Sequence, residues 1–437
     1  MFRISAIVAL TTLFVACGPP NKPKPDAGEE VDAGMMEVDA GRVRGDDPPT
    51  GWQVIAELPG TAAPSSRLGV SAASVPDQFQ QPMVAALYED PNGDLNYDDN
   101  RVVFTRWDGT AKAFSELKTI EVVGGTLATP NSREISIARD ASTGRIVIAY
   151  VKPQTNTIRV AISDDEGANF SLSTVDDEVH AAADSNPSVA VHDGVIQLAF
   201  LQGSSLFYRK KTGSAAWVDA SPPGITVASK AISLAVDSAG DVALAFFLFA
   251  ADPASAELAF WRPTTGGGVV ASADGFDLTV AGREPSVSLT FEGTTPHLAF
   301  HLPKSDAADT TQLWYLKSSD SGTAWGTPVA IPRNSSGAIF HSTQWYQAIA
   351  VEADGKVSIA APWSALGTQS NCNGPKLARS SDGVTFQTCS PVGSPIQRGG
   401  DYLSLWSHKP GKLTLIFFYD SRTNPSIKPG LVMWREL

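Results

Sequence analysis

The chain has 437 residues, of which 43% are hydrophobic and 18% are charged. This composition supplies enough apolar material for a large core and excludes a wholly disordered chain. The net charge of −13 argues against a nucleic-acid-binding protein, because such a protein needs a basic surface to contact phosphates. The 37 glycines and 30 prolines favour many turns over long helices.

The first element in chain order is an export signal. An almost wholly apolar run covers residues 4–16, which is short for a transmembrane helix of about 20 residues. The run ends in Leu13-Phe14-Val15-Ala16-Cys17-Gly18, which resembles the lipobox of bacterial lipoproteins. The resemblance implies that residues 1–17 are a lipoprotein signal peptide and that Cys17 carries a lipid. The alternative is an ordinary cleaved signal with an incidental cysteine.

Residue 18 bears on the location of the protein. By resemblance to enterobacterial lipoprotein sorting, a glycine after the lipidated cysteine implies the outer membrane. We therefore expect a lipid-anchored protein of the bacterial cell envelope, on the periplasmic or the exposed side of that membrane.

Residues 18–50 are predicted to form a disordered acidic tether. They contain several prolines, no aromatic residue and three Asp-Ala-Gly copies, which start at Asp26, Asp32 and Asp39. Such a stretch cannot bury enough apolar surface to offset the entropy lost on ordering. It would separate the anchor from the following domain as a flexible spacer.

The remaining segment, 51–437, repeats itself. Two clear copies start at Pro187 and Pro285, and each reads as a strand, a tight turn and a second strand. Strand pairs begin near residues 67, 133, 185, 230, 284, 346 and 401. The units are thus about 55 residues long, a normal length for four-stranded propeller blades. We predict an all-β, seven-bladed β-propeller, with a six-bladed ring as the alternative.

The last unit supplies three strands and lacks a fourth. Residues 51–58 at the start of the repeat region have the pattern of a fourth strand. We therefore predict that the N-terminal strand completes the last blade. Ring closure of this kind removes two sheet edges that would otherwise be open.

A second motif follows the third strand of several units. Residues 163–170 and 318–325 match S-x-D-x-G-x-x-[FW], and residues 380–386 match it with one residue fewer. The motif resembles the Asp-box, or bacterial neuraminidase repeat (BNR), of the sialidase-like β-propeller superfamily. We expect Asp and Ser to cap backbone N–H groups, Gly to adopt a positive φ and the aromatic residue to fill the gap to the neighbouring sheet.

Polar residues recur where the chain enters the innermost strand of each unit, which is where propellers of this type bind ligands. The residues predicted to bind a ligand are Arg67, Arg133, Lys230, Arg283, Trp345, Tyr346, Arg398 and Tyr402. Arginine forks hold carboxylates and aromatic rings pack on sugar faces, so an acidic or hydroxyl-rich ligand is expected. The alternative is that these residues pair with one another around a solvated channel.

The resemblance to sialidases also implies catalytic roles. A triad for the substrate carboxylate would be drawn from Arg67, Arg133, Arg283 and Arg398, with Tyr402 or Tyr346 as nucleophile, Glu134 or Glu284 as its helper and Asp401 as acid/base. However, the chain lacks the Phe-Arg-Ile-Pro sequence common in sialidases, and it has seven units instead of six. We therefore expect a binding module for a glycan, peptide or partner protein. An exo-α-sialidase is the alternative, and a non-catalytic scaffold the second alternative.

Two smaller features complete the sequence analysis. Cys372 and Cys389 are expected to form a disulfide, because an exported protein folds in an oxidising compartment. Oxygen-bearing side chains at alternate positions resemble a calcium loop, with a solvated acidic turn as the other interpretation; they are Asp90, Asn92, Asp94, Asn96 and Asp98. Apart from this calcium ion no cofactor is predicted, and no nucleic-acid partner.

Overall fold

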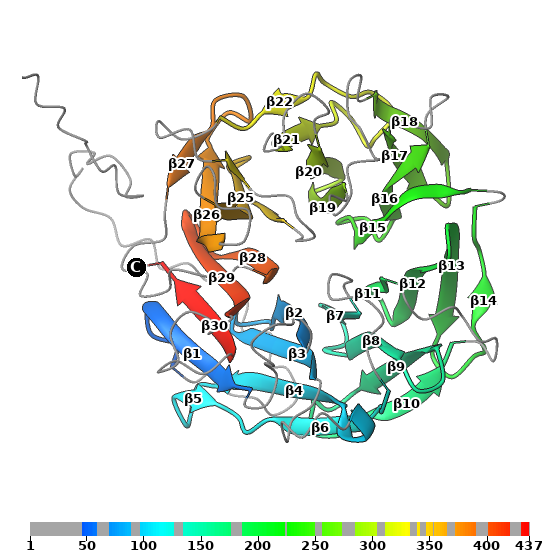
Figure 1. The fold of residues 1–437 in the computed structure, drawn as a ribbon, viewed down its shortest axis with the longest axis vertical. Helices are drawn as coiled ribbons and strands as arrows, with labels where there is room; N and C mark the ends of the chain where they lie inside the picture. Colours follow the sequence, from blue (N-terminus) through cyan, green and yellow to red (C-terminus); the bar gives the residue numbers. More distant parts are fainter. Residues whose placement is uncertain are drawn as a thin grey trace, which may run out of the picture.

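A computed structural model describes residues 46–58, 70–88, 97–125, 134–175, 186–222, 225–249, 256–272, 285–303, 311–332, 339–340, 347–352, 354–364, 372–389, 401–419 and 430–436. The described strands form seven antiparallel sheets arranged around one axis (Figure 1). The chain is therefore a seven-bladed β-propeller, as predicted. The predicted signal peptide with Cys17 and residues 18–45 of the predicted tether lie outside the described part, so both stay predictions.

Each blade is numbered by its order in the chain. Blade 1 comprises β2 (Val70–Pro76), β3 (Pro82–Tyr88), the 3-10 turn η1 (Tyr97–Asp99), β4 (Arg101–Asp108), β5 (Ala113–Phe114) and β6 (Lys118–Val122). Blade 2 comprises β7 (Ile135–Arg139), β8 (Ile146–Lys152), β9 (Thr157–Ser163) and β10 (Ser171–Thr174). Blade 3 comprises β11 (Ser188–His192), β12 (Val195–Gln202), β13 (Ser205–Thr212) and β14 (Val218–Asp219).

The other four blades follow the same plan. Blade 4 comprises β15 (Val227–Val236), β16 (Val242–Phe249), β17 (Ala256–Arg262) and β18 (Gly266–Ser272). Blade 5 comprises β19 (Ser286–Glu292), β20 (Thr295–Pro303), β21 (Thr311–Lys317) and β22 (Val329–Ala330). Blade 6 comprises β23 (Ile339–Phe340), β24 (Ala348–Val351), β25 (Val357–Ser364), β26 (Cys372–Ser380) and β27 (Gln387–Cys389). Blade 7 comprises β28 (Asp401–Lys409), β29 (Lys412–Tyr419), β30 (Gly430–Arg435) and the N-terminal β1 (Gly51–Glu57).

The N-terminal strand closes the ring. β1 pairs antiparallel with β30, so that Gly51 lies opposite Arg435 and Glu57 lies opposite Gly430. The innermost strands of blades 7 and 1, β28 and β2, also contact each other. The prediction that the first strand completes the last blade is therefore confirmed.

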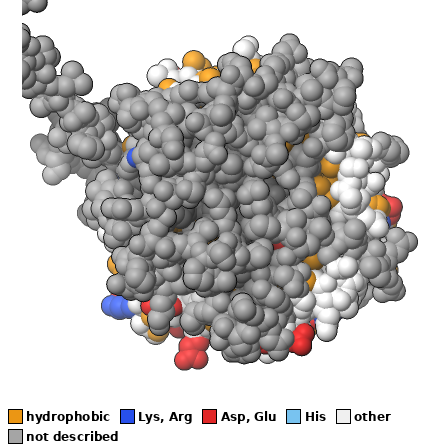
Figure 2. Space-filling view, in the orientation of Figure 1, with side chains coloured by type: hydrophobic (Ala, Val, Ile, Leu, Met, Phe, Trp, Pro, Cys, Tyr) orange, Lys and Arg blue, Asp and Glu red, His pale blue; other side chains and the backbone are white. Residues whose placement is uncertain are grey.

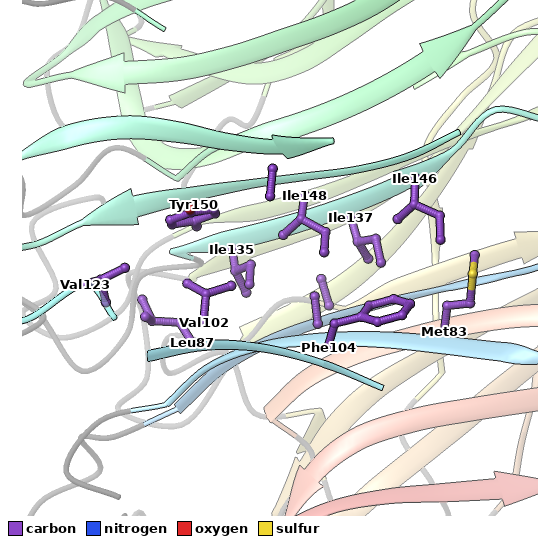
Figure 3. Packing of buried hydrophobic residues seen from close by; sticks show 13 residues of the cluster. Met83, Leu87, Val102, Phe104, Val123, Ile135, Ile137, Ile146, Ile148 and Tyr150 are labelled. Atoms are coloured by element: carbon purple, nitrogen blue, oxygen red, sulfur yellow. The ribbon is translucent and has the colours of Figure 1, made fainter. Parts of the chain in front are cut away.

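The hydrophobic core lies between the blades. The described residues form seven buried clusters, and each cluster draws its side chains from two adjacent blades. Between blades 1 and 2, Met83, Leu87 and Phe104 pack against Ile135 and Ile148 (Figure 3). A single blade cannot bury both of its faces alone, so the blades stabilise one another around the ring.

Serine hydroxyls join the innermost strand of one blade to the next. Ser188 Oγ in β11 accepts a hydrogen bond from the backbone N–H of Leu234 in β15 at 3.0 Å. The same bond recurs at four other seams, between Ser71 and Glu134 (3.0 Å), Ser136 and Val189 (3.2 Å), Ser233 and Leu289 (3.0 Å), and Ser404 and Ser74 (3.2 Å). Between blades 5 and 6, Ser288 donates to the carbonyl of Gln347 at 2.5 Å. The serine thus provides a partner for a backbone group that faces the next blade.

Turns after the third strand clamp an aromatic residue of the preceding blade. Asp320 Oδ1 accepts bonds from the N–H groups of Gly322 and Ala324, at 2.9 and 3.0 Å. Gly322 has a φ of 109°, and a Cβ there would lie 2.4 Å from the ring of Phe260. Trp325 packs edge-on against the same ring, at 5.1 Å between ring centroids. The predicted roles of Asp, Gly and the aromatic residue are confirmed.

The other two copies of this turn repeat the clamp. Gly167 and Phe170 hold Phe104, and Gly383 and Phe386 hold Tyr315. The clamp explains the spacing of the motif in geometric terms. The similarity of the motif to the Asp-box of sialidases remains a resemblance in sequence.

The predicted disulfide is not decided by the described residues. Cys372 opens β26 opposite Ser364, and Cys389 ends β27 opposite Leu377. The side chain of Cys372 lies outside the described part, so the Cys372–Cys389 pair stays a prediction.

The serine bonds predict a specific loss of stability. Replacing Ser188 by Ala leaves the N–H of Leu234 without its partner and should lower the free energy of unfolding by about 1–3 kcal/mol. Denaturant unfolding measures this change. Ser204→Ala, at an exposed serine of the same blade, is the control. Equal effects of the two substitutions would contradict a structural role for the hydroxyl of Ser188.

Candidate functional site

The two faces of the propeller are built differently. We call the side on which tight turns join the innermost strand to the second strand the turn face. The opposite side, on which the innermost strands begin, is the front face. Several turns on the turn face are capped by carboxylates; Asp237 Oδ1, for example, accepts bonds from the N–H groups of Ala239 and Asp241, both at 2.9 Å. This capping makes the turn face a rigid base.

Arginines on the turn face hold neighbouring blades together. Arg262 in blade 4 binds Asp237 at 2.9 Å, with side-chain exposures of 5% and 2%. It also donates to the carbonyl of Ser321 in blade 5 at 3.0 Å. Arg106 takes the same position in blade 1 and binds the carboxylate of Glu166 in blade 2 at 2.9 Å. These charges are used within the fold.

Most of the residues predicted to bind a ligand lie outside the described part of the chain. They are Arg67, Arg133, Arg283, Trp345, Tyr346 and Arg398, and the same holds for the catalytic candidate Glu284. Their convergence into one pocket therefore stays a prediction.

The backbone of three other candidates is described. Lys230 lies in β15, in a stretch between Val227 and Ile232 where the pairing with β16 is interrupted. Asp401 and Tyr402 open β28, which has a similar interruption between Asp401 and Ser404. Both of these interruptions fall at the front-face end of an innermost strand; β28 has a second irregularity at its turn-face end, between Ser407 and Lys409. Irregularities of this kind are common next to binding and active sites, because they change the alternation of side chains along a strand.

The remaining catalytic candidate, Glu134, is buried. It is 1% exposed, and its N–H donates to Ser71 Oγ at 3.0 Å while its carbonyl accepts from Val151 at 3.0 Å. Gln347 lies at the equivalent place in blade 6 and is also 1% exposed. Its amide nitrogen donates to the carbonyls of Ser286 and Ala299 in blade 5, at 3.1 and 2.5 Å. These front-face positions therefore join blades.

A cluster of ionisable side chains between blades 1 and 2 was missed in the sequence analysis. The carboxylate of Glu121 in β6 accepts bonds from Lys152 Nζ at 2.8 Å and Arg159 Nε at 3.3 Å, and from the hydroxyl of Tyr150. No local motif signals this cluster, because Glu121 lies about 30 residues before its partners in the chain.

The chemistry of this cluster favours a structural role. Burial alone would raise the pKa of Glu121, but the bonds from Lys152 and Tyr150 and the charge of Arg159 outweigh it and lower this pKa. Burial raises the pKa of Tyr150 well above its ordinary value. The hydroxyl of Tyr150 donates to the carboxylate of Glu121, so Tyr150 belongs to this ion-pair cluster between the two blades.

The rim of the ring exposes single aliphatic side chains. The outermost strands of five blades carry Val54, Val122, Leu172, Val218 and Val269, which are 41–60% exposed. Figure 2 shows described hydrophobic and acidic side chains scattered at this rim. Isolated aliphatic residues are normal on protein surfaces, so they do not form an apolar docking patch.

Metal and membrane features were also sought among the described residues. These residues hold no group of three or more His, Cys, Asp or Glu side chains suited to a metal ion. Of the calcium candidates only Asp98 is described, as an exposed residue of η1, and the calcium site stays a prediction. The described part of the chain also has no helix that is long and apolar enough to cross a bilayer.

Comparison with known proteins bears on the fold. A scan against known protein families finds no match for this chain. A search of curated proteins likewise finds no relative. Among solved structures, the chain is similar to the α-L-arabinanase of Penicillium chrysogenum complexed with arabinobiose, with a TM-score of 0.51 and 10% identity over 89% of this chain and 99% of that one.

Two further solved structures have comparable similarity. An ulvan lyase, a polysaccharide lyase bound to a GlcA–Rha3S unit, has a TM-score of 0.51 and 10% identity over 90% of this chain and 96% of that one. The α-L-arabinofuranosidase of Fusarium graminearum, in complex with an iminosugar inhibitor, has a TM-score of 0.50 and 11% identity over 88% of this chain and 97% of that one. At these identities the similarity shows the propeller fold and not the activity.

A buried histidine lies near the seam of blades 5 and 6. His297 in β20 is fully buried, and its Nδ1 lies 2.7 Å from the hydroxyl of Tyr315. Its Nε2 lies 3.5 Å from Glu292. The pKa of His297 is lowered from 6.5 to about 4, mainly by burial and also by the charge of Lys317, while Glu292 opposes the shift. His297 and His301 both lie in β20.

This histidine predicts a loss of stability in acid. The unfolded chain binds a proton near pH 6.5, whereas the folded protein resists protonation until about pH 4. The contribution of His297 is therefore complete above pH 6.5 and is lost as the pH falls to about 4, by roughly 3 kcal/mol in total. His297→Gln should flatten the pH dependence of the free energy of unfolding in this window. His192→Gln, at a histidine whose side chain is 36% exposed, should leave this pH dependence as steep as in the unaltered protein. Equal slopes for the unaltered protein and the two variants would refute the assignment to His297.

Proposed function

We propose that this protein is a carbohydrate-binding propeller of the bacterial cell envelope, attached through a lipid on Cys17, with its ligand site on the front face. The observation that carries this proposal is the difference between the two faces. On the turn face, carboxylates cap tight turns and arginines bind neighbouring blades. On the front face, the innermost strands that carry Lys230 and Tyr402 are irregular at their beginnings.

The class of ligand is supported by the structural neighbours. Three propellers with TM-scores of 0.50–0.51 were solved with arabinobiose, a GlcA–Rha3S unit or an iminosugar inhibitor. The basic residues that precede the innermost strands favour an acidic sugar, because guanidinium groups bind carboxylates and sulfates through paired hydrogen bonds.

Binding is favoured over hydrolysis for a chemical reason. The described catalytic candidate Glu134 is buried at the seam of blades 1 and 2. An exo-α-sialidase that uses Tyr402 or Tyr346 is the alternative. A peptide or protein ligand and a non-catalytic scaffold are the further alternatives.

A glycan array probed with the purified protein tests the ligand class. We expect saturable binding to acidic glycans without turnover of a fluorogenic sialoside. Arg283→Ala should weaken binding about tenfold, the value of one charged hydrogen bond. Lys356→Ala, at an exposed lysine near a turn-face hairpin, is the control. Sialoside turnover that is abolished by Arg283→Ala would contradict this proposal and favour the exo-α-sialidase. Binding to a peptide would favour a peptide or protein ligand. Binding to no ligand would favour the non-catalytic scaffold.

The lipid anchor has its own test. In an exporting bacterial host we expect the protein in the membrane fraction, with a mass increase of a lipid on Cys17. Cys17→Ser should lack this added mass. A mature unaltered protein without the added mass would show that the cysteine is incidental.

A further inference from the structure

A short acidic segment before β1 contacts blade 1. The backbone N–H of Asp46 donates to the carbonyl of Gly109 at 2.8 Å. The carbonyl of Asp46 accepts a bond from Trp107 Nε1 at 2.7 Å. Its carboxylate also pairs with Lys112. Trp107 is 2% exposed and packs edge-on against Phe114, so Asp46 is held by a fixed partner.

The next residue contacts the other side of the seam. The carboxylate of Asp47 lies 3.6 Å from Lys409 Nζ and 3.7 Å from Arg435 Nη2, and both cations belong to blade 7. Arg435 is almost fully buried, and Pro48 is buried as well. Two consecutive residues therefore bind two blades that come from opposite ends of the chain.

All of these partners lie at turn-face ends of strands. Trp107 and Gly109 lie where β4 ends, Lys409 ends β28 and Arg435 ends β30. β1 then runs from the turn face to the front face, since its first residue, Gly51, pairs with Arg435. The chain thus reaches the propeller on the turn face, at the seam that closes the ring.

We propose that residues 46–48, here named the strap, lock blade 1 to blade 7 and fix the N-terminal segment on the turn face. A chain attached through residues before the strap then presents its front face away from the point of attachment. This geometry leaves that face accessible to a large extended ligand such as a polysaccharide. The choice of ligand rests on the proposed function, whereas the strap and its position do not.

Cleavage by a protease that cuts before aspartate tests whether the strap is docked. In the full chain, Asp39 should be cut rapidly and Asp46 and Asp47 slowly. Trp107→Phe removes the bond to the carbonyl of Asp46 but keeps the packing of the ring, and should speed cleavage at these two sites about tenfold. Trp217→Phe, which removes a bond to Ser173 at the outer rim, should leave the rates unchanged.

A second variant covers the case in which Trp107→Phe disturbs blade 1. Lys112 and Lys409 are 69% and 59% exposed, so replacing both by alanine removes two ion pairs of the strap without touching the core. Faster cleavage at Asp46 and Asp47 is again expected. Cleavage at Asp46 as rapid as at Asp39 in the unaltered protein would overturn the strap.

Spin-label distances test the position of the N-terminal segment. One spin label is placed at Val43→Cys. The second label is placed either at Ala141→Cys on the turn face or at Thr155→Cys on the front face. Ala141 and Thr155 are exposed and lie in blade 2. We expect the shorter mean distance to Ala141→Cys. Equal or reversed mean distances would overturn the proposed geometry. Neither readout depends on a glycan or a lipid, so failure of the proposed function would be seen separately.

Discussion

The structure depends on hydrogen-bond partners for the backbone groups at the inner edge of each blade. The innermost strand of a sheet has an edge without a neighbouring strand, and its backbone N–H groups need partners other than a ladder. A serine hydroxyl of the adjacent blade accepts a hydrogen bond from such an N–H group at five seams. At a sixth seam the hydroxyl of Ser288 instead donates to the backbone carbonyl of Gln347. These bonds and the interblade hydrophobic clusters together hold neighbouring blades to one another.

The closing seam has an additional requirement, because the first and last blades are not joined by consecutive chain. β1 supplies the fourth strand of blade 7, and the chain then continues to blade 1. Asp46 and Asp47 span the same seam before β1 begins. Strand pairing and the strap thus act on one seam from the same short stretch of chain, so ring closure and attachment of the N-terminal segment are physically linked.

The division of work between the two faces accounts for the proposed function. Caps, aromatic clamps and ion pairs such as Arg262–Asp237 make the turn face rigid. A rigid base positions the beginnings of the innermost strands, where side chains from separate blades can meet around one axis. Binding sites built on such a scaffold recognise a ligand with little loss of conformational entropy.

The sequence by itself determined the seven blades, the closing N-terminal strand and the construction of the clamp turns. These features follow from local patterns, namely the alternation of apolar residues and the turn chemistry of Asp and Gly. At the candidate site it named the positions before the innermost strands, but it did not show that Glu134 is buried. Only the tertiary structure decided the serine seams, the cluster around Glu121 and the strap. Each of these joins residues that lie tens to hundreds of positions apart, and no local pattern encodes which of them come into contact.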